Sequence, residues 1–209
     1  MEIVEQVLRT ERLILRPVTA GDHAVLQAHW TTPDVRRFLF DGATLSAAEI
    51  TAAIEDSARD FGRAGYGLWL IHEKVGTDLA GTDLAGTDLA GTDLVDTDLA
   101  GTDLARTDLV GTDLAGADLV GTAGLRPLED LGLEIFYSLA PGSWGRGYAT
   151  EAAGAVLAYA LGPLGLPEVL AEVDEGNAAS IAVIERLGMT RFDVVSGLLG
   201  PMIRYRKTA

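Results

Sequence analysis

The residues best suited to chemistry form a glycine-rich turn, Ser143-Trp144-Gly145-Arg146-Gly147-Tyr148-Ala149-Thr150, between an apolar run and an alanine-rich helical pattern. Glycines at 145 and 147 let the backbone come close to a ligand, because neither carries a Cβ. The first N–H groups of the following helix favour an anion by hydrogen bonding and by the helix dipole. Arg146 adds a positive charge at the rim. This spacing is typical of a phosphate site, and equally of a plain strand-to-helix turn.

The surroundings of the turn resemble the acyl-CoA motif of the GNAT superfamily of N-acetyltransferases, Gln/Arg-x-x-Gly-x-Gly/Ala. Trp144, Gly147 and Ala149 occupy its first, fourth and sixth positions. Trp144 departs from the pattern, in a form similar to that of the branch with the ribosomal-protein-alanine N-acetyltransferases. Three further stretches resemble the family, so that the similarity covers most of the chain: Glu11 to Pro17, Asn177 to Ser180, and Glu185 to Met189.

The resemblance implies an α+β fold in three layers, with a mixed, mostly antiparallel sheet flanked by helices, in a single domain over residues 1–209. Local patterns predict strands at 10–18, 65–72, 121–128, 133–139, 169–173, 189–194 and 201–207. Helices are expected from Thr19 or Asp22 to 30, and at 33–40, 46–63, 147–161 and 177–188. Helix 46–63 has capping-box spacing at its start, and its apolar stripe is expected to contain Ile50, Ile54, Ala58 and Phe61.

The resemblance also implies acetyl-CoA as co-substrate and an amine as acceptor. Its pyrophosphate would bind mainly to backbone N–H groups of Trp144, Gly145, Arg146, Gly147, Tyr148, Ala149 and Thr150. Strand 133–139 would separate from the next strand near Tyr137, Ser138 and Leu139, so that its free backbone groups pair with the pantetheine arm. An N–H near Leu139 would donate to the developing oxyanion.

Two polar residues near the C-terminal helix complete the implied cofactor site. Asn177 and Ser180 would contact the pantetheine arm near the sulfur, while Asn177 can also simply cap a helix. Ser180 is a candidate proton donor to the leaving thiolate. A serine nucleophile is not expected, because the sequence shows no His-Asp partner set.

Glu134 is the candidate general base, directly or through a water, since it is the only carboxylate on strand 133–139. A base of this kind needs burial or neighbours that raise its pKa towards the working pH. Phe136, on the same face of the strand, could contribute that burial. The alternative is a solvated glutamate on an exposed strand face.

The aromatic residues and histidines before residue 76 give weaker signals. Phe38, Phe40 and Trp69 could line the acceptor pocket, or belong to the core. His23, His29 and His72 are expected in the core or on the surface, because none has a second metal ligand nearby. We therefore expect no metal site.

Composition narrows the class of protein. A length of 209 residues suits one well-packed domain, and the absence of cysteine excludes disulfides, thiolate metal sites and a cysteine nucleophile. The acidic first residues do not resemble a secretory signal, and no apolar stretch is long enough to span a bilayer. A cytoplasmic protein with no membrane segment is expected.

A low-complexity array separates the second and third expected strands. Gly-Thr-Asp-Leu-Ala recurs nine times, with few changes, from Gly76 to Val120. Residues 76–120 hold ten Asp and one Arg, a net charge of −9 out of −15, which leaves −6 for the remainder. The array resembles pentapeptide-repeat proteins but is short for a continuous core, so that it is expected to be a loop or a short β-helical stub inserted in a hairpin. The net charge argues against direct nucleic-acid binding.

Together these features predict an N-acetyltransferase that acts on a protein N-terminus or a small primary amine by direct attack in a ternary complex. One alternative is a non-catalytic acyl-CoA-binding protein. Another is an acidic repeat protein that mimics nucleic acid through residues 76–120. The sequence identifies neither the acceptor nor whether the protein is a monomer or a homodimer.

Overall fold

The computed structural model describes residues 6–74, 118–129 and 131–209. The described residues other than Lys74 form one compact unit, which belongs to Met1–Glu73 and Asp118–Ala209. All helices and strands of the described residues belong to this unit. The loop or β-helical stub expected for the array falls on 75–117, outside the described residues, and the single-domain extent of 1–209 stays a prediction.

Eight strands of the described residues form one mixed sheet in the order β1-β2-β3-β4-β5-β6-β8-β7. All neighbouring strands are antiparallel except β5 and β6, which run parallel. This arrangement confirms the expected mixed, mostly antiparallel sheet. The strands are β1 (Leu8–Arg9), β2 (Leu13–Pro17), β3 (Leu68–Glu73), β4 (Leu119–Leu128), β5 (Gly132–Leu139), β6 (Glu168–Asp174), β7 (Thr190–Ser196) and β8 (Pro201–Thr208).

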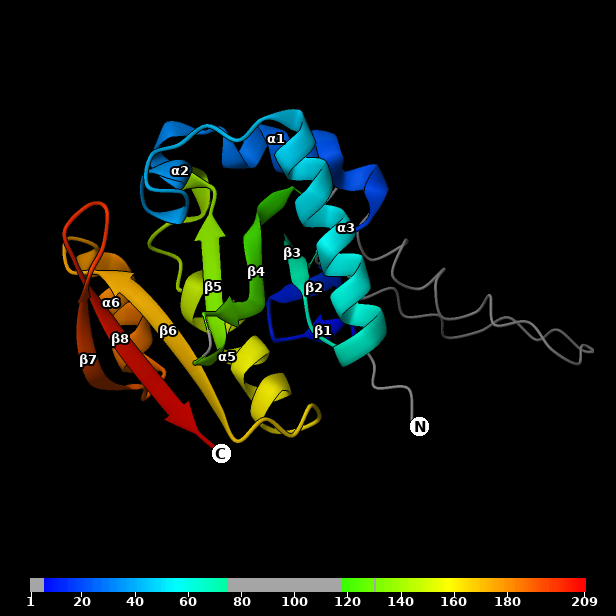
Figure 1. Ribbon diagram of the computed structural model, residues 1–209. Coiled ribbons are helices and arrows are strands. Elements are labelled where there is room, and N and C mark those ends of the chain that lie inside the picture. Colours follow the sequence, from blue (N-terminus) through cyan, green and yellow to red (C-terminus); the bar gives the residue numbers. More distant parts are fainter. Residues whose placement is uncertain (1–5, 75–117, 130) are drawn as a thin grey trace, which may run out of the picture. The chain divides into compact units, whose positions relative to one another are not determined.

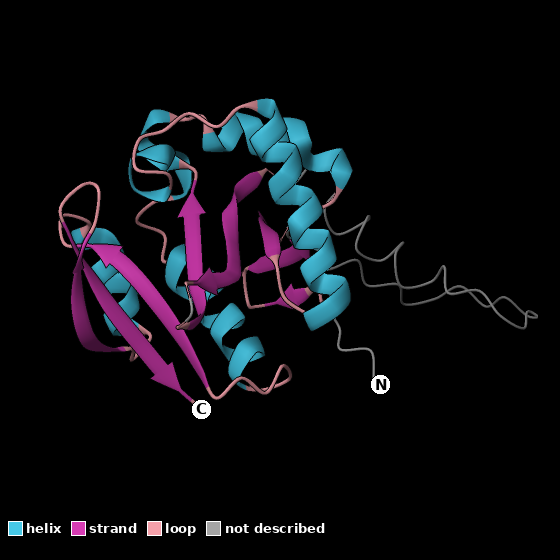
Figure 2. Cartoon of the chain, in the orientation of Figure 1, coloured by secondary structure: helices cyan, strands magenta, loops and turns pink. Residues whose placement is uncertain are grey.

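Helices flank the sheet and pack on it through two hydrophobic clusters (Figures 1 and 2). Successive side chains of a strand point to opposite faces: in β3, Trp69 and Ile71 join the cluster of α5 and α6, whereas Leu68 and Leu70 join that of α1, α2 and α3. The helical segments are η1 (Ala20–Asp22), α1 (His23–Trp30), α2 (Pro33–Leu39), α3 (Ala47–Ala64), η3 (Pro141–Ser143), α5 (Tyr148–Leu161) and α6 (Ala178–Arg186).

The long helix α3 begins and ends at the expected signals. The Ser46 side chain accepts the Glu49 N–H, and the Glu49 carboxylate accepts the Ser46 N–H in return. Gly65, at φ 76°, ends the helix in the left-handed conformation. One predicted core position is wrong: Ala58 is exposed and Ser57 is buried in its place. The hydroxyl of Ser57 can be buried because it accepts the N–H of Leu68 at 2.8 Å.

Most element ends lie within two residues of the prediction. Strand β4 begins at Leu119 rather than 121, so the last two residues of the repeat pattern belong to the sheet. Strand β3 begins at Leu68 rather than 65. The 3₁₀ turn η1 precedes α1, because Thr19 and Asp22 cap each other three residues apart.

The sheet opens between β5 and β6. These two strands pair at one position, Glu134 opposite Leu170, and no further ladder joins their described residues. They diverge towards their C-terminal ends (Figure 1). The expected separation near Tyr137, Ser138 and Leu139 is therefore present, and it leaves backbone groups of β5 unpaired on that side.

Candidate active site

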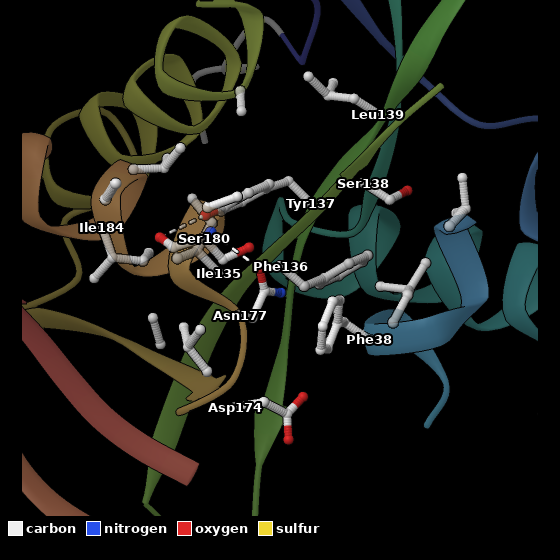
Figure 3. Close-up of a pocket in the computed structure, with 18 of the residues that line it drawn as sticks. Phe38, Ile135, Phe136, Tyr137, Ser138, Leu139, Asp174, Asn177, Ser180 and Ile184 are labelled. Carbon is white, nitrogen blue, oxygen red and sulfur yellow. Dashed lines mark hydrogen bonds between the residues drawn. The ribbon is translucent and has the colours of Figure 1, made fainter. Parts of the chain in front are cut away.

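A cavity of about 1070 Å³ lies at this opening (Figure 3). Most of its lining comes from β5, the glycine-rich turn, α6, the second half of β6, and α2, with single residues from β4 and β8. All predicted site residues except Arg146 lie in its wall, namely Glu134, Tyr137, Ser138, Leu139, Trp144, Gly145, Gly147, Tyr148, Ala149, Thr150, Asn177 and Ser180.

The glycine-rich turn has the backbone that an anion site requires. Gly145 and Gly147 have φ of 73° and 80°, the left-handed region that side chains other than glycine rarely adopt. Gly147 is the N-cap of α5 and brings no side chain that could accept the first N–H groups of the helix. Those N–H groups, at the positive end of the dipole of a 14-residue helix, remain available to an anion.

The charged side chains in and around the turn form ion pairs with one another and do not line the cavity. Arg146 forms a bidentate pair with Glu73 at 2.8 and 3.1 Å, and the Tyr148 hydroxyl donates to the same carboxylate. The hydrogen bond from Tyr148 lowers the pKa of Glu73. Arg12 pairs with Glu151 at 2.6 Å and donates to the Arg146 carbonyl. The positive charge expected of Arg146 is thus paired with the carboxylate of Glu73.

Two aromatic residues of the turn serve different purposes. Tyr148 is buried, and the guanidinium groups of Arg12 and Arg146 lie 4.7 and 4.6 Å from its ring centroid. Trp144 is 51% exposed, and its indole N–H donates to the Leu139 carbonyl at 2.9 Å. Tyr148 thus anchors the turn in the core, whereas Trp144 ties the turn to the end of β5.

The register of β5 determines where its free N–H groups point. The N–H of Ala140 donates to the carbonyl of Val120, and antiparallel pairs alternate between hydrogen-bonded and non-hydrogen-bonded positions. With Gly121 opposite Leu139 and Ala123 opposite Tyr137, the N–H groups of Leu139 and Tyr137 point away from β4. They face the opening beside β6, as expected for an oxyanion donor near Leu139.

Glu134 is 4% exposed, in the cavity wall at the point where β5 and β6 meet. Burial raises the pKa of its carboxyl group, and the charge of Arg126 opposes that shift. Arg126 stands opposite it in the ladder and donates to it at 2.7 Å. The alternative of a solvated glutamate is therefore excluded, while the arginine partner was not foreseen.

The start of α6 places polar groups across the opening from β5. The Asn177 side chain accepts the Ser180 N–H at 3.1 Å, which makes it the N-cap of the helix. The Tyr137 hydroxyl donates to the Ser180 carbonyl at 3.3 Å, and burial raises the pKa of Tyr137 to about 12. Tyr137 is therefore a neutral phenol at physiological pH. Asn177, Ser180 and Tyr137 appear together in Figure 3.

A buried chain of hydrogen bonds reaches the cavity from the opposite face. His29 Nε2 lies 2.9 Å from the Ser138 hydroxyl, which lies 2.8 Å from that of Thr122, and Thr122 accepts the indole N–H of Trp30 at 3.3 Å. Burial lowers the pKa of His29 to about 4, so its imidazole is neutral near pH 7. His29 lies in the core as expected. Its bond to Ser138 joins residues 109 positions apart, and no local signal could have predicted it.

The acceptor side of the cavity differs from the prediction. Of the three candidate aromatics only Phe38 lines the cavity. Phe40 packs edge-on against Trp30, and Trp69 is buried between Phe61 and Tyr159. A buried carboxylate that sequence reasoning missed, Asp174, completes this wall.

The described residues contain neither a metal-binding cluster nor a membrane-spanning helix. No group of three or more His, Asp or Glu side chains there could hold a metal ion. No helix among them is both long and apolar enough to cross a membrane.

A mixed sheet that opens between two parallel strands, beside the uncapped start of a helix, is the framework of an acetyltransferase domain. The chain matches the family described as Acetyltransferase (GNAT) domain over residues 12–190, and it therefore belongs to that family. This finding confirms the expected acetyltransferase class.

One curated relative and two solved structures are similar to the chain. An uncharacterized Bacillus subtilis (strain 168) protein, YkkB, is 46% identical over 57 residues, 27% of this chain and 33% of its own length. The chain thus spans about a third of the length of this relative. Two solved structures share the fold: an acetyltransferase from Agrobacterium tumefaciens str. C58 (TM-score 0.69, 21% identity, 100% and 98% of the two chains) and the ribosomal L7/L12 alpha-N-protein acetyltransferase RimL in complex with coenzyme A (TM-score 0.67, 12% identity, 97% of each).

Proposed function

We propose that this protein transfers the acetyl group of acetyl-CoA to a primary amine, at a protein N-terminus or on a small molecule, by direct attack in a ternary complex. One observation carries the proposal: a single cavity joins the uncapped start of α5, the free N–H groups of β5 and the buried carboxylate of Glu134. These groups can bind a pyrophosphate, stabilise an oxyanion and accept a proton.

Each part of acetyl-CoA has suitable partners in the cavity. The backbone N–H groups from Gly145 to Thr150 would hold the pyrophosphate. That of Trp144, which was also expected to contribute, donates instead to the Pro141 carbonyl. The free backbone groups of Tyr137 and Leu139, with Asn177 and Ser180, would hold the pantetheine arm. The thioester supplies the activated acyl group, and the protein supplies binding, orientation and proton transfer.

The groups that line the cavity can account for each bond and each proton of the acetyl transfer. Glu134 takes a proton from the acceptor ammonium, directly or through a water. The free amine nitrogen then forms a C–N bond with the acyl carbon while the C–S bond breaks. The N–H of Leu139 or Tyr137 stabilises the negative charge that develops on the acyl oxygen. The Ser180 hydroxyl donates a proton to the leaving thiolate and regains one from the acetylated nitrogen, which loses this second proton to become the amide.

Two further observations support a class of acceptor and a cellular compartment. The fold of a ribosomal-protein acetyltransferase and the Trp-Gly-x-Gly form of the turn support a protein N-terminus as one acceptor class. The absence of cysteine from the sequence fits a reducing compartment such as the cytoplasm.

The test has two stages. Calorimetry should show that the full chain binds CoA and acetyl-CoA, and thiol release should show turnover with members of a panel of amines and N-terminal peptides. Binding without turnover on any acceptor would support the non-catalytic alternative. Failure to bind CoA would overturn the proposal.

A further inference from the structure

Three carboxylates lie on one face of the sheet at the opening. Glu134 stands opposite Leu170 in the parallel pair, so Glu172 and Asp174, two and four residues beyond Leu170, project to the same side as Glu134. All three line the cavity. Two of them are neutralised: Arg126 donates to Glu134 at 2.7 Å, and Arg204 donates to Glu172 at 2.6 Å.

Asp174 has no such partner. It is 6% exposed, its Oδ1 accepts no hydrogen bond, and it forms no salt bridge with any residue in the part of the chain that the structure describes. A buried charge without a partner is costly. Burial raises the pKa of Asp174, and the negative charge of Asp41 raises it further. Since Asp174 lies in the cavity wall, a bound cation can supply the missing partner.

Three arginines line the cavity: Arg186 is exposed at the end of α6, and the other two lie against aromatic rings. The guanidinium of Arg37 lies 4.9 Å from the ring centroid of Phe38, and that of Arg126 lies 5.1 Å from that of Phe136. Asp34 and Asp41, from α2 and the turn after it, add negative charge to the same wall. In Figure 3, Asp174 lies on the side of Phe38 and Asn177, far from Leu139. This end of the cavity therefore favours a positively charged ligand.

We propose that Asp174 binds a second positive charge on the acceptor, distinct from the amine that is acetylated. The proposal rests on the proposed function and deepens it by naming the acceptor class: an amine with another cationic group at a distance. Leu170 is the residue of β6 opposite Glu134, and Asp174 lies four positions further along β6. At the usual rise per residue, the two positions on β6 are roughly 13 Å apart. That separation suits a flexible diamine or a longer cationic chain.

The experiment compares straight-chain diamines of increasing length with monoamines of equal length, on the wild-type chain, Asp174→Asn and Glu175→Gln. Glu175 is the matched control, because it is an exposed carboxylate next to Asp174 and does not line the cavity. For Asp174→Asn we expect the KM for the longer diamines to rise about tenfold, as for a lost charge-assisted hydrogen bond. Its kcat, its KM for monoamines and its CoA affinity should not change, and Glu175→Gln should match wild type throughout.

A second measurement needs no turnover. Calorimetric titration of the diamine into the chain saturated with CoA should show binding that Asp174→Asn weakens about tenfold, while unchanged CoA affinity shows that the variant is folded. Equal diamine affinity in wild type and Asp174→Asn would overturn the inference. So would a loss of CoA affinity in Asp174→Asn with an unaltered preference for diamines, because Asp174 would then serve the cofactor. Absence of CoA binding or of turnover on every amine would instead overturn the proposed function.

Discussion

Charged side chains form ion pairs at one end of the cavity, whereas a carboxylate at the other end has no ion partner among the described residues. At the glycine-rich turn, Arg12 pairs with Glu151 and Arg146 pairs with Glu73, and the backbone N–H groups at the start of α5 have no capping side chain. At the end of β6, Asp174 is buried without an ion partner among the described residues. In the proposed function the turn binds the same cofactor in every reaction, so the charged side chains around it can serve to fix its backbone. The end at Asp174 would select the acceptor, which requires a charge that no other side chain neutralises.

The largest predicted effect concerns the chemistry between the two ends. Glu134→Gln should lower kcat by roughly 100-fold or more, the usual contribution of a general base, and leave CoA affinity unchanged. For the wild-type chain, kcat/KM should increase as pH rises through the pKa of Glu134, because the base must be ionised and burial raises that pKa. Steady-state kinetics against pH would measure both effects. Glu55→Gln, an exposed carboxylate on α3, is the control, and an unaltered kcat in Glu134→Gln would exclude Glu134 as the base.

The next effect tests the turn. Gly147→Val should raise the dissociation constant of CoA about tenfold, because a side chain at φ 80° costs on the order of 1 to 2 kcal/mol and its Cβ would lie 3.4 Å from the Arg12 guanidinium. The KM for the acceptor should not move. Gly142→Ala is the control, since a Cβ there meets no atom within 4 Å. If both variants bind CoA like wild type, the conformation of the turn does not determine affinity.

The smallest effects are on stability, and they have opposite signs at the two ends. Burial favours protonated Glu151, but hydrogen bonds from Thr10 and Arg12 outweigh burial and lower its pKa. Its stabilisation is present above the pKa of an unfolded glutamate and disappears as pH falls through the lowered value. Glu151→Gln should therefore reduce the free energy of unfolding by about 1 kcal/mol at pH 7, and by less at pH 3, in urea titrations.

Asp174→Asn should do the reverse. The raised pKa of Asp174 destabilises the folded chain as pH rises above the pKa of an unfolded aspartate, and the penalty is complete above the folded value. The variant should be more stable than wild type at pH 7, by up to about 1 kcal/mol, and equal to it near pH 3. A variant less stable than wild type at pH 7 would show that the carboxylate has a partner.

Local signals predicted most of the individual helices and strands, whereas the arrangement of the sheet was implied by the family resemblance. Capping at Ser46, the glycine turn and the alternation in β5 each depend on residues close in sequence, and each is present. A signal based on hydrophobicity alone failed at Ser57, which is buried because β3 supplies a distant N–H. Local signals thus suffice where the partner is a neighbour in the chain.

The site was predictable only in part, for the same reason. The motif identified the backbone that faces the ligand. The side chains that hold it, such as the Arg146 pair with Glu73 or the His29 bond to Ser138, meet across 73 and 109 residues. Asp174 belongs to no recognisable sequence motif. Its place in the cavity wall depends on the divergence of β5 from β6, which the sequence alone does not show.

The small side chain of Ala123 bears on the register in which β4 pairs with its neighbouring strands. A repetitive sequence next to a strand favours a slip of one repeat, since Gly116-Ala117-Asp118 stands five residues before Gly121-Thr122-Ala123. A slip of five would bring Asp118 to the position of Ala123, which is 0% exposed in the core, where a carboxylate is strongly unfavourable. The change from Asp to Ala at this position therefore disfavours the shifted register of β4.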